Sequence, residues 1–261
     1  MKLNPYLDFI SELAYRAGRI TLGYFNTGVT PDYKPDDTPV TIADRAAEKF
    51  IRGELGKRFP THAILGEEYG ETSGSDSAMR WIIDPIDGTK SFMRGMPLYA
   101  VLIGLEIEGV IQVGAAYYPG TDELLTAADG KGAWWNGRRA HVSTVESVDK
   151  SWVCFTNVRN MEKHGRGEAW NRINSRAYAA RGWGDAYGYL AVATGRAEAM
   201  LDPIMATWDC GPFPVILREA GGFFGSWDGR EGHLFNEALA CNSLILPEML
   251  NLIKDEQKIP S

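Results

Sequence analysis

The chain has 261 residues, with 27 Lys and Arg against 34 Asp and Glu, so its formal net charge is −7. Its apolar fraction of 44% and charged fraction of 23% are those of a folded globular protein, which excludes disordered and collagen-like classes. An acidic chain without a basic block is a poor candidate for binding nucleic acid through its phosphates. The longest uncharged apolar stretch, Met96–Leu105, is too short to span a bilayer.

The cysteines and the first residues indicate the compartment. Cys154, Cys210 and Cys241 form an odd, sparse set, which argues against a disulfide scaffold and favours a reducing environment. Asp8 and Glu12 interrupt the first apolar residues, and this does not fit a signal peptide. We therefore expect a cytoplasmic protein that binds neither nucleic acid nor membranes.

Two helices are predicted in the first sixty residues. An Asn-Pro pair at 4–5 has the form of an N-cap followed by proline, and apolar residues then recur at helical spacing until about 26–28. Turn-forming residues make 30–38 a loop. Thr41 is then a second N-cap, and its helix stops at Pro60.

Short apolar runs predict strands in the middle of the chain. Runs at 63–65 and 81–83 each end in acidic residues. Runs at 99–107 and 110–118 flank a Glu-Gly pair that is typical of an antiparallel hairpin. A stretch rich in Ser and Gly at 72–77 is expected to be a mobile loop.

The second half is predicted to be a mixed sheet with two helices. One helix covers 185–194 and is ended by Gly195. The other begins near Asp209 and runs toward Ala220. Because strands and helices mix without a regular βαβ alternation, the sequence favours a layered α+β sandwich over a Rossmann sheet or a barrel.

Acidic residues gather where predicted strands and the last helix meet loops. A Glu-Glu pair at 67–68 follows one strand, Asp84 and Asp87 follow another, and Asp209 starts the last helix. Half-buried carboxylates repel one another unless a cation compensates, and such hard oxygen ligands suit Mg²⁺ or Mn²⁺. The proline between the two aspartates can turn both carboxylates, and the carbonyl of Ile86, toward one point.

The residues after Asp87 add an anion site. Gly88 and Thr89 open a predicted helix, whose free amide groups can bind phosphate. Two divalent ions beside a phosphate ester can activate a water on one side and stabilise a leaving alkoxide on the other. Each piece alone fits a surface turn or a solvated strand end, whereas all of them together favour a metal-dependent phosphate ester site.

Three segments resemble the signature motifs of the inositol monophosphatase family: GEE at 66–68, WIIDPIDGT at 81–89 and WDCGPFPVILREAGG at 208–222. The resemblance covers nearly the whole chain. It implies a Mg²⁺-dependent, lithium-sensitive phosphomonoesterase with a layered αβαβα fold, two or three ions per active site and a homodimeric assembly. It implies one phosphatase domain over 1–261, with a metal- and phosphate-binding lobe at about 1–145 and a substrate lobe at about 146–261.

The same resemblance assigns roles to single residues. The implied metal ligands are Glu67, Asp84 and the Ile86 carbonyl for the first ion, and Asp84, Asp87 and Asp209 for the second. Thr89 and Glu67 would orient the attacking water. The amides of Gly88 and Thr89 would hold the phosphate, while Asp44 and Thr41 match a catalytic supporting pair.

The segment after Trp208 departs from the family pattern. The family helix here is usually rich in alanine, whereas this chain has Gly211, Pro212 and Pro214. Two prolines disturb a regular helix interior. We therefore expect the helix to begin later than in the family, which affects how Asp209 is presented.

Further segments resemble the histidinol-phosphate phosphatase branch of the family: RGWGDAYGYLAVATGRAEAMLDP at 181–203, DGTKSF at 87–92, GMPL at 95–98 and AWWNGRR at 133–139. A carboxylate beside a phosphate site, such as Asp185, can pair with a cationic substrate. Histidinol phosphate carries an ammonium group and inositol phosphate does not. Asp202 matches a position that contacts the other end of the substrate. A helix N-cap is the alternative role for Asp185, and an ordinary turn is the alternative for Asp202.

The predicted function is hydrolysis of L-histidinol phosphate to L-histidinol and phosphate, in histidine biosynthesis, by a metal-activated water. One alternative is an inositol-1-monophosphatase or a broad-specificity phosphatase of the same family. Another is a non-catalytic binding or regulatory relative, against which the intact acidic set and Thr89 argue.

Overall fold

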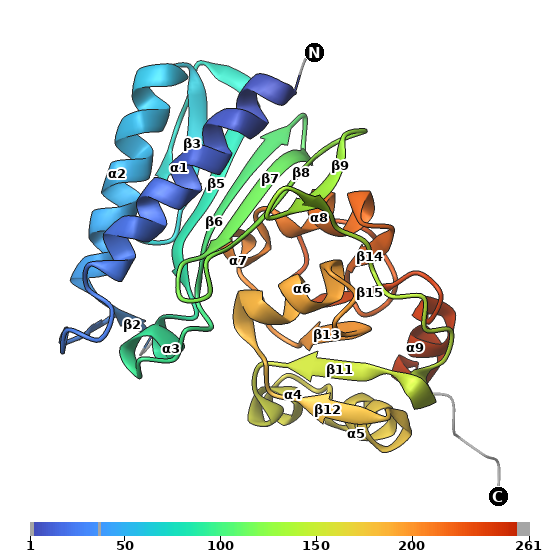
Figure 1. Cartoon of the computed structure of the whole chain (residues 1–261). Coiled ribbons are helices and arrows are strands. Elements are labelled where there is room, and N and C mark those ends of the chain that lie inside the picture. Colours follow the sequence, from blue (N-terminus) through green and yellow to red (C-terminus); the bar gives the residue numbers. More distant parts are fainter. Residues whose placement is uncertain (1–2, 36–37, 255–261) are drawn as a thin grey trace, which may run out of the picture.

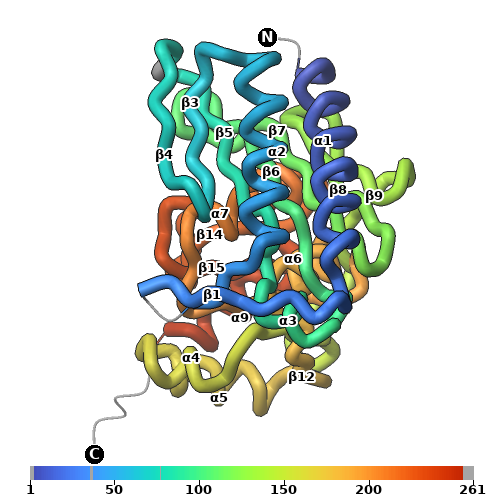
Figure 2. Tube along the Cα trace, turned by 90° about the vertical axis from the view of Figure 1, so that its left-hand side faces the viewer, coloured from blue at the N-terminus to red at the C-terminus, as the bar shows by residue number. Residues whose placement is uncertain are grey.

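The computed structural model describes residues 3–35 and 38–254, which form five layers in the order α-β-α-β-α (Figure 1). The first layer contains α1 (Asn4–Leu22) and α2 (Ile42–Arg58), which lie side by side over the eight-stranded sheet (Figure 2). The strands of this sheet, in spatial order, are β10 (Arg138–Arg139), β9 (Gly132–Trp135), β8 (Glu123–Ala128), β7 (Val110–Tyr118), β6 (Ala100–Ile107), β5 (Asp76–Asp87), β3 (His62–Gly66) and β4 (Gly70–Thr72).

A middle helical layer separates this sheet from a second, five-stranded one. The middle helices are α6 (Asp185–Ala193), α7 (Thr207–Cys210) and α8 (Phe213–Glu219). The strands of the second sheet, in spatial order, are β12 (Ala179–Arg181), β11 (Trp152–Phe155), β13 (Ala199–Asp202), β15 (Ala238–Asn242) and β14 (Gly222–Gly225). The outer layer contains α4 (Val158–Lys163), α5 (Gly167–Arg176) and α9 (Leu246–Ile253).

Short elements complete the chain: β1 (Asp32–Tyr33), β2 (Pro39–Val40), α3 (Thr89–Met93) and the 3₁₀ turn η1 (Val148–Lys150). All three cysteines are free and buried, as expected for a protein without a disulfide scaffold. No helix in the described ranges combines the length and the apolar character that crossing a membrane requires.

The alternation of side chains along β6 explains why helices cover both faces of the first sheet. Val101 and Ile103 pack in the apolar core under α1 and α2, whereas Ala100 and Leu102 pack in the core shared with α6 and α8. Successive residues of a strand point to opposite faces, so a fully apolar strand must be buried on both. A third core lies between the second sheet and the outer helices. The layered αβαβα sandwich predicted from the sequence is therefore confirmed.

Most local predictions are confirmed. Thr41 caps α2, and β6 and β7 form the predicted hairpin around Glu108-Gly109. The expected loop at 30–38 contains β1, and its residues Asp36 and Asp37 lie outside the described residues. The expected loop at 72–77 is shorter, because β4 ends at Thr72 and β5 already begins at Asp76.

The prediction of two helices in the second half is wrong. The second half also contains α4, α5 and α9, and the helix expected from Asp209 toward Ala220 is split into α7 and α8. Two glycines of the first sheet lie against the break at Gly211 and Pro212. Gly104 of β6 and Gly114 of β7 face each other, and a Cβ on either would meet the backbone of Gly211 or Pro212. The paired glycines therefore let the broken helix approach the sheet.

This close approach predicts the effect of adding one methyl group. Gly104→Ala should lower the free energy of unfolding by about 1–3 kcal/mol, because the added Cβ would clash with the Gly211 backbone and neither side can yield easily. Gly53→Ala in α2 is the matched control, since nothing lies within 4 Å of its added Cβ. Thermal unfolding checks this: the control should gain up to about 1 kcal/mol, and equal effects of both substitutions would contradict the packing argument.

Candidate functional site

Three aspartates converge between the first sheet and the middle helices. Carboxylate oxygens of Asp84, Asp87 and Asp209 all lie within 4.8 Å of one another. Asp84 and Asp87 come from the end of β5, and Asp209 comes from α7. The sequence prediction that these residues form one cluster is thus matched by their positions.

A bulge in β5 explains how Asp84 and Asp87 share one face. In a regular strand, residues three apart point to opposite faces. Asp84 pairs with Leu102 and Asp87 with Ala100, so β5 has one extra residue where β6 advances by two. The extra residue restores both carboxylates to the same side. The amide of Ile86, inside the bulge, donates to Asp84 Oδ1 at 2.9 Å.

Asp209 is held in place by its own short helix. Its Oδ2 accepts from the amide of Ala206 at 2.9 Å, just before α7 begins. The helix therefore does not begin later than Asp209, as the two prolines had suggested. Instead it breaks after Cys210, so Asp209 keeps its place beside the end of β5.

The cluster is short of positive charge. Burial, followed by the negative charges of Glu67, Asp87 and Asp209, raises the pKa of Asp84 well above its usual range. Burial and the charges of Asp185 and Asp209 do the same for the pKa of Asp87. Burial raises the pKa of Asp209 to about 7. Hard carboxylate oxygens that repel one another in a buried setting are the donor set that a divalent cation fits.

Glu67 lies beside the cluster and touches a lysine that sequence reasoning missed. It follows β3 directly, and its negative charge helps to raise the pKa of the Asp84 carboxyl. Lys34 Nζ lies 2.8 Å from Glu67 Oε1 and 2.9 Å from Glu68 Oε1. No local signal marks a single lysine in a polar loop thirty residues upstream, since only the fold brings it to the site.

A chain of hydroxyl and carboxyl groups joins Thr41, Asp44 and Thr89. Thr41 and Asp44 form a capping box, in which the Thr41 hydroxyl and amide donate to Asp44 Oδ2 at 2.6 and 2.8 Å. The Thr89 hydroxyl lies 3.3 Å from Asp44 Oδ1 and 3.0 Å from the Ile86 carbonyl oxygen. Burial is the main cause that raises the pKa of Asp44 to about 6. Asp44 is thus a buried carboxyl within reach of Thr89.

Asp185 does not cap its helix. The residue before α6 is Gly184, and no side chain caps that end. Asp185 Oδ2 instead accepts from the Ser91 hydroxyl at 3.4 Å, and a Cβ on Gly88 would lie 3.2 Å from it. The amide of Ala186 donates to Asp87. The capping role considered for Asp185 is therefore not what the structure contains, and its carboxylate faces the Gly88 turn.

Asp202 ends β13 and is buried. Tyr189 donates its hydroxyl to Asp202 Oδ2 at 2.8 Å, and burial raises the pKa of this carboxyl to about 7. One cavity brings the acidic residues of both halves together; it is lined by Asp87, Thr156, Asn160, Asp185, Tyr189, Asp202, Ile204, Met205 and Asp209. Thr156, Asn160 and Tyr189 carry no recognisable motif, and sequence reasoning missed them.

Comparison with known proteins decides the family. The model of the inositol monophosphatase family matches residues 2–258. The chain belongs to the inositol monophosphatase family. It is therefore an enzyme of a metal-dependent phosphatase family that acts on small phosphate esters.

Relatives in this family differ in the substrate that their names give. A histidinol-phosphatase from Chlorobaculum parvum is 42% identical over 238 residues, covering 91% of this chain and 92% of that protein. An inositol-1-monophosphatase from Mesorhizobium japonicum is 35% identical, covering 97% of this chain and 98% of that protein. The crystal structure of the extragenic suppressor protein suhB from Bartonella henselae has a TM-score of 0.90 at 30% identity, covering 97% of this chain and 100% of that one.

The crowded carboxylates predict how stability depends on pH and metal. A carboxyl whose pKa is raised by folding binds its proton more tightly in the folded chain, so stability falls as pH rises from the unfolded pKa to the folded one. For Asp209 this window runs from about 4 to about 7. In EDTA the melting temperature should therefore fall between about pH 5 and about pH 7. Mg²⁺ at about a hundred times its Kd should restore about 2.7 kcal/mol at pH 8.

Thermal unfolding of two variants checks this prediction. Asp87→Asn removes one charge of the cluster, so it should reduce both the loss in EDTA and the gain with Mg²⁺. Asp8→Asn, an exposed change of the same kind, should behave as the wild type. If Mg²⁺ does not raise the melting temperature of the wild type at pH 8, the role of the cluster as a metal site is contradicted.

Proposed function

We propose that the protein is a Mg²⁺-dependent phosphomonoesterase that hydrolyses L-histidinol phosphate to L-histidinol and phosphate. The observation that supports this substrate is the position of Asp185, whose carboxylate does not cap its helix and faces the Gly88 turn. The 42% identity to a protein named histidinol-phosphatase supports the same substrate. A cytoplasmic location, a homodimer and a division into lobes near residue 145 stay predictions.

In this proposal the acidic cluster holds the metal ions. Glu67, Asp84 and the Ile86 carbonyl would bind the first ion, and Asp84, Asp87 and Asp209 the second; a third ion and Mn²⁺ are compatible with the same donors. When bound, such ions lower the pKa of a coordinated water and stabilise charge on the leaving oxygen. The raised pKa values of the cluster support this, because repulsion among the carboxylates disappears when cations lie between them.

The residues around Gly88 position the phosphate and the water. Gly88 has a φ of 87°, a left-handed conformation that turns the chain sharply after Asp87. In the proposal, this turn aims the amides of Gly88 and Thr89 at the phosphate. The Thr89 hydroxyl and Glu67 orient the attacking water. The proton of the Thr89 hydroxyl then has an acceptor in Asp44, 3.3 Å away.

This arrangement predicts that the Thr89 hydroxyl matters for turnover. Thr89→Ala should lower kcat about 10²-fold or more with little change in KM, because positioned proton transfer contributes at least that much. Thr89→Ser keeps the hydroxyl and should keep most of the activity. Steady-state kinetics checks both variants. Mass spectrometry of enzyme quenched during turnover should find no phosphorylated side chain, and a trapped phosphoenzyme would contradict attack by water.

Charge decides the substrate in this proposal. The ammonium group of histidinol phosphate can form a charge-assisted hydrogen bond with Asp185, while the Gly88 turn holds the phosphate. Asp202, which lines the same cavity, would contact the other end of the substrate. A neutral polyol can offer the Asp185 carboxylate only hydroxyl hydrogen bonds, which leave its negative charge uncompensated.

Asp185→Asn tests the substrate directly. Loss of a charge-assisted hydrogen bond of about 1.5–3 kcal/mol corresponds to roughly ten- to a hundredfold in kcat/KM for histidinol phosphate. Hydrolysis of glycerol phosphate, which has no cationic group, should change little. Equal losses on both substrates would make the role of Asp185 structural.

The second candidate substrate is inositol 1-phosphate, favoured by the 35% identity to a protein named inositol-1-monophosphatase. A panel of phosphate esters assayed with wild-type enzyme and Mg²⁺ separates the two. A preference for inositol phosphate over histidinol phosphate would overturn the proposed substrate and leave the metal-dependent phosphatase intact.

A further inference from the structure

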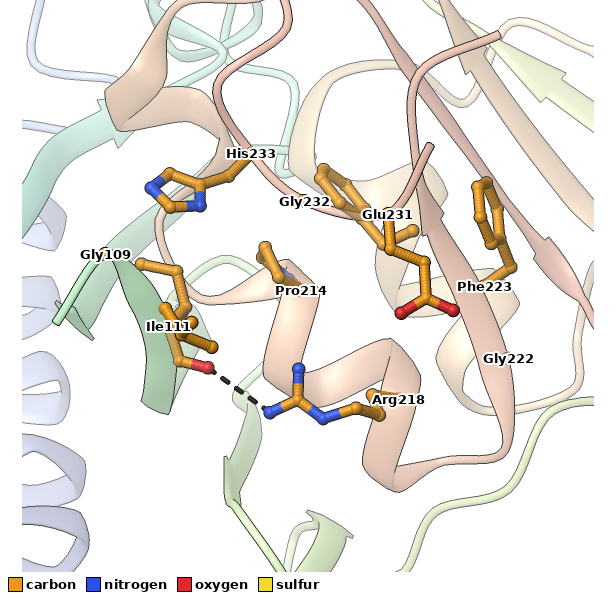
Figure 3. Close-up of a pocket in the computed structure, with 11 residues that line it drawn as sticks. Gly109, Ile111, Pro214, Arg218, Gly222, Phe223, Glu231, Gly232 and His233 are labelled. Atoms are coloured by element: carbon orange, nitrogen blue, oxygen red, sulfur yellow. Dashed lines mark hydrogen bonds between the residues drawn. The ribbon is translucent and has the colours of Figure 1, made fainter. Parts of the chain in front are cut away.

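A second pocket shares no lining residue with the acidic cavity. It has a volume of about 280 Å³ and lies between the β6–β7 turn, α8, β14 and the loop after Gly229 (Figure 3). Its walls come from segments far apart in the sequence, including Ile111, Arg218, Phe223 and Glu231. Nothing in the phosphatase reaction uses these residues.

Arg218 and Glu231, the two oppositely charged side chains of this pocket, have polar atoms without a hydrogen-bond partner in the described chain. Figure 3 shows the guanidinium of Arg218 and the carboxylate of Glu231 pointing toward the middle of the pocket. Arg218 donates through Nη2 to the Ile111 carbonyl at 3.3 Å and to Asp129 Oδ1 at 3.0 Å, which leaves its Nε and Nη1 without an acceptor in the described chain. Within residues 3–35 and 38–254, the Glu231 carboxylate accepts no hydrogen bond and forms no ion pair, not even with Arg218.

The rest of the pocket is apolar and firmly held. Phe223, Phe224, Pro214 and Ile111 line it together with the two charged side chains. Beside them, His233 is 4% exposed and its Nε2 lies 2.8 Å from Glu106 Oε2. Arg80 binds both oxygens of that same carboxylate, at 3.1 and 2.9 Å. This buried network fixes the loop to the first sheet, so the pocket is preformed.

We propose that this pocket binds a small zwitterion with an apolar side chain, which is the chemical class of an α-amino acid. Its carboxylate would bind the free Nε and Nη1 of Arg218, because a guanidinium has donors in a fixed fork that matches a carboxylate. Its ammonium would bind Glu231, and its side chain would pack against Phe223 and Pro214. A ligand with only one charge can form only one of these two contacts, so it should bind more weakly than the zwitterion.

Equilibrium binding of three related probes tests the proposal on the full chain with Mg²⁺. L-phenylalanine carries both charges, 2-phenylethylamine lacks the carboxylate and 3-phenylpropionate lacks the ammonium. We expect saturable binding of one L-phenylalanine per chain, with each analogue at least about tenfold weaker. Arg218→Gln and Glu231→Gln should each weaken L-phenylalanine binding by a similar factor. Both side chains are exposed, and the ion pair that Arg218 forms with Asp129 is a surface one, so both variants should fold.

Two controls place the binding at this pocket. Arg176→Gln removes another exposed arginine, on α5, and should leave binding unchanged. Asp185→Asn should also leave it unchanged, which separates this pocket from the proposed substrate site. The proposal is overturned if L-phenylalanine shows no saturable binding up to about 20 mM, if either analogue binds equally well, or if the two pocket variants bind like the wild type.

Discussion

Repulsion among buried carboxylates is the constraint on which the rest of this structure depends. Asp84, Asp87 and Asp209 place oxygens within 4.8 Å of one another, and burial raises the pKa of each. Such an arrangement costs stability in the metal-free chain, because each charge is removed from water next to another of the same sign. The fold nevertheless maintains it through a bulge in β5 and a break between α7 and α8. The arrangement that the bulge and the break maintain would become favourable when cations lie between the carboxylates and compensate their charges.

The two halves of the chain contribute different residues to one site. The first sheet supplies the end of β5 and the Gly88 turn, which suit metal and phosphate. The second half supplies Asp185 and Asp202, which line the same cavity as Asp87 and Asp209. If Asp185 and Asp202 contact the substrate as proposed, substitutions in α6 and β13 would change substrate preference without altering the carboxylates of β5. This division fits relatives of similar identity whose names give different substrates.

Features with a local cause could be predicted from the sequence. The cap at Thr41, the β6–β7 hairpin and the acidic strand ends each depend on residues a few positions apart. Features set by distant contacts could not be predicted. The helix break after Cys210 makes sense only with the glycine pair of β6 and β7, and Lys34 reaches Glu67 only through the fold. Short helices such as α4 and α9 owe their stability to packing on the second sheet more than to their own periodicity.

Locating the cations would test most directly whether the carboxylate cluster holds metal. Crystals grown with Mn²⁺ and measured at the manganese absorption edge would show the ions as anomalous difference peaks. We expect a strong peak between Asp84, Asp87 and Asp209, with carboxylate oxygens at about 2.0–2.3 Å, and a second near Glu67 and the Ile86 carbonyl. An absence of anomalous density among these carboxylates at saturating Mn²⁺ would contradict a metal site in the cluster.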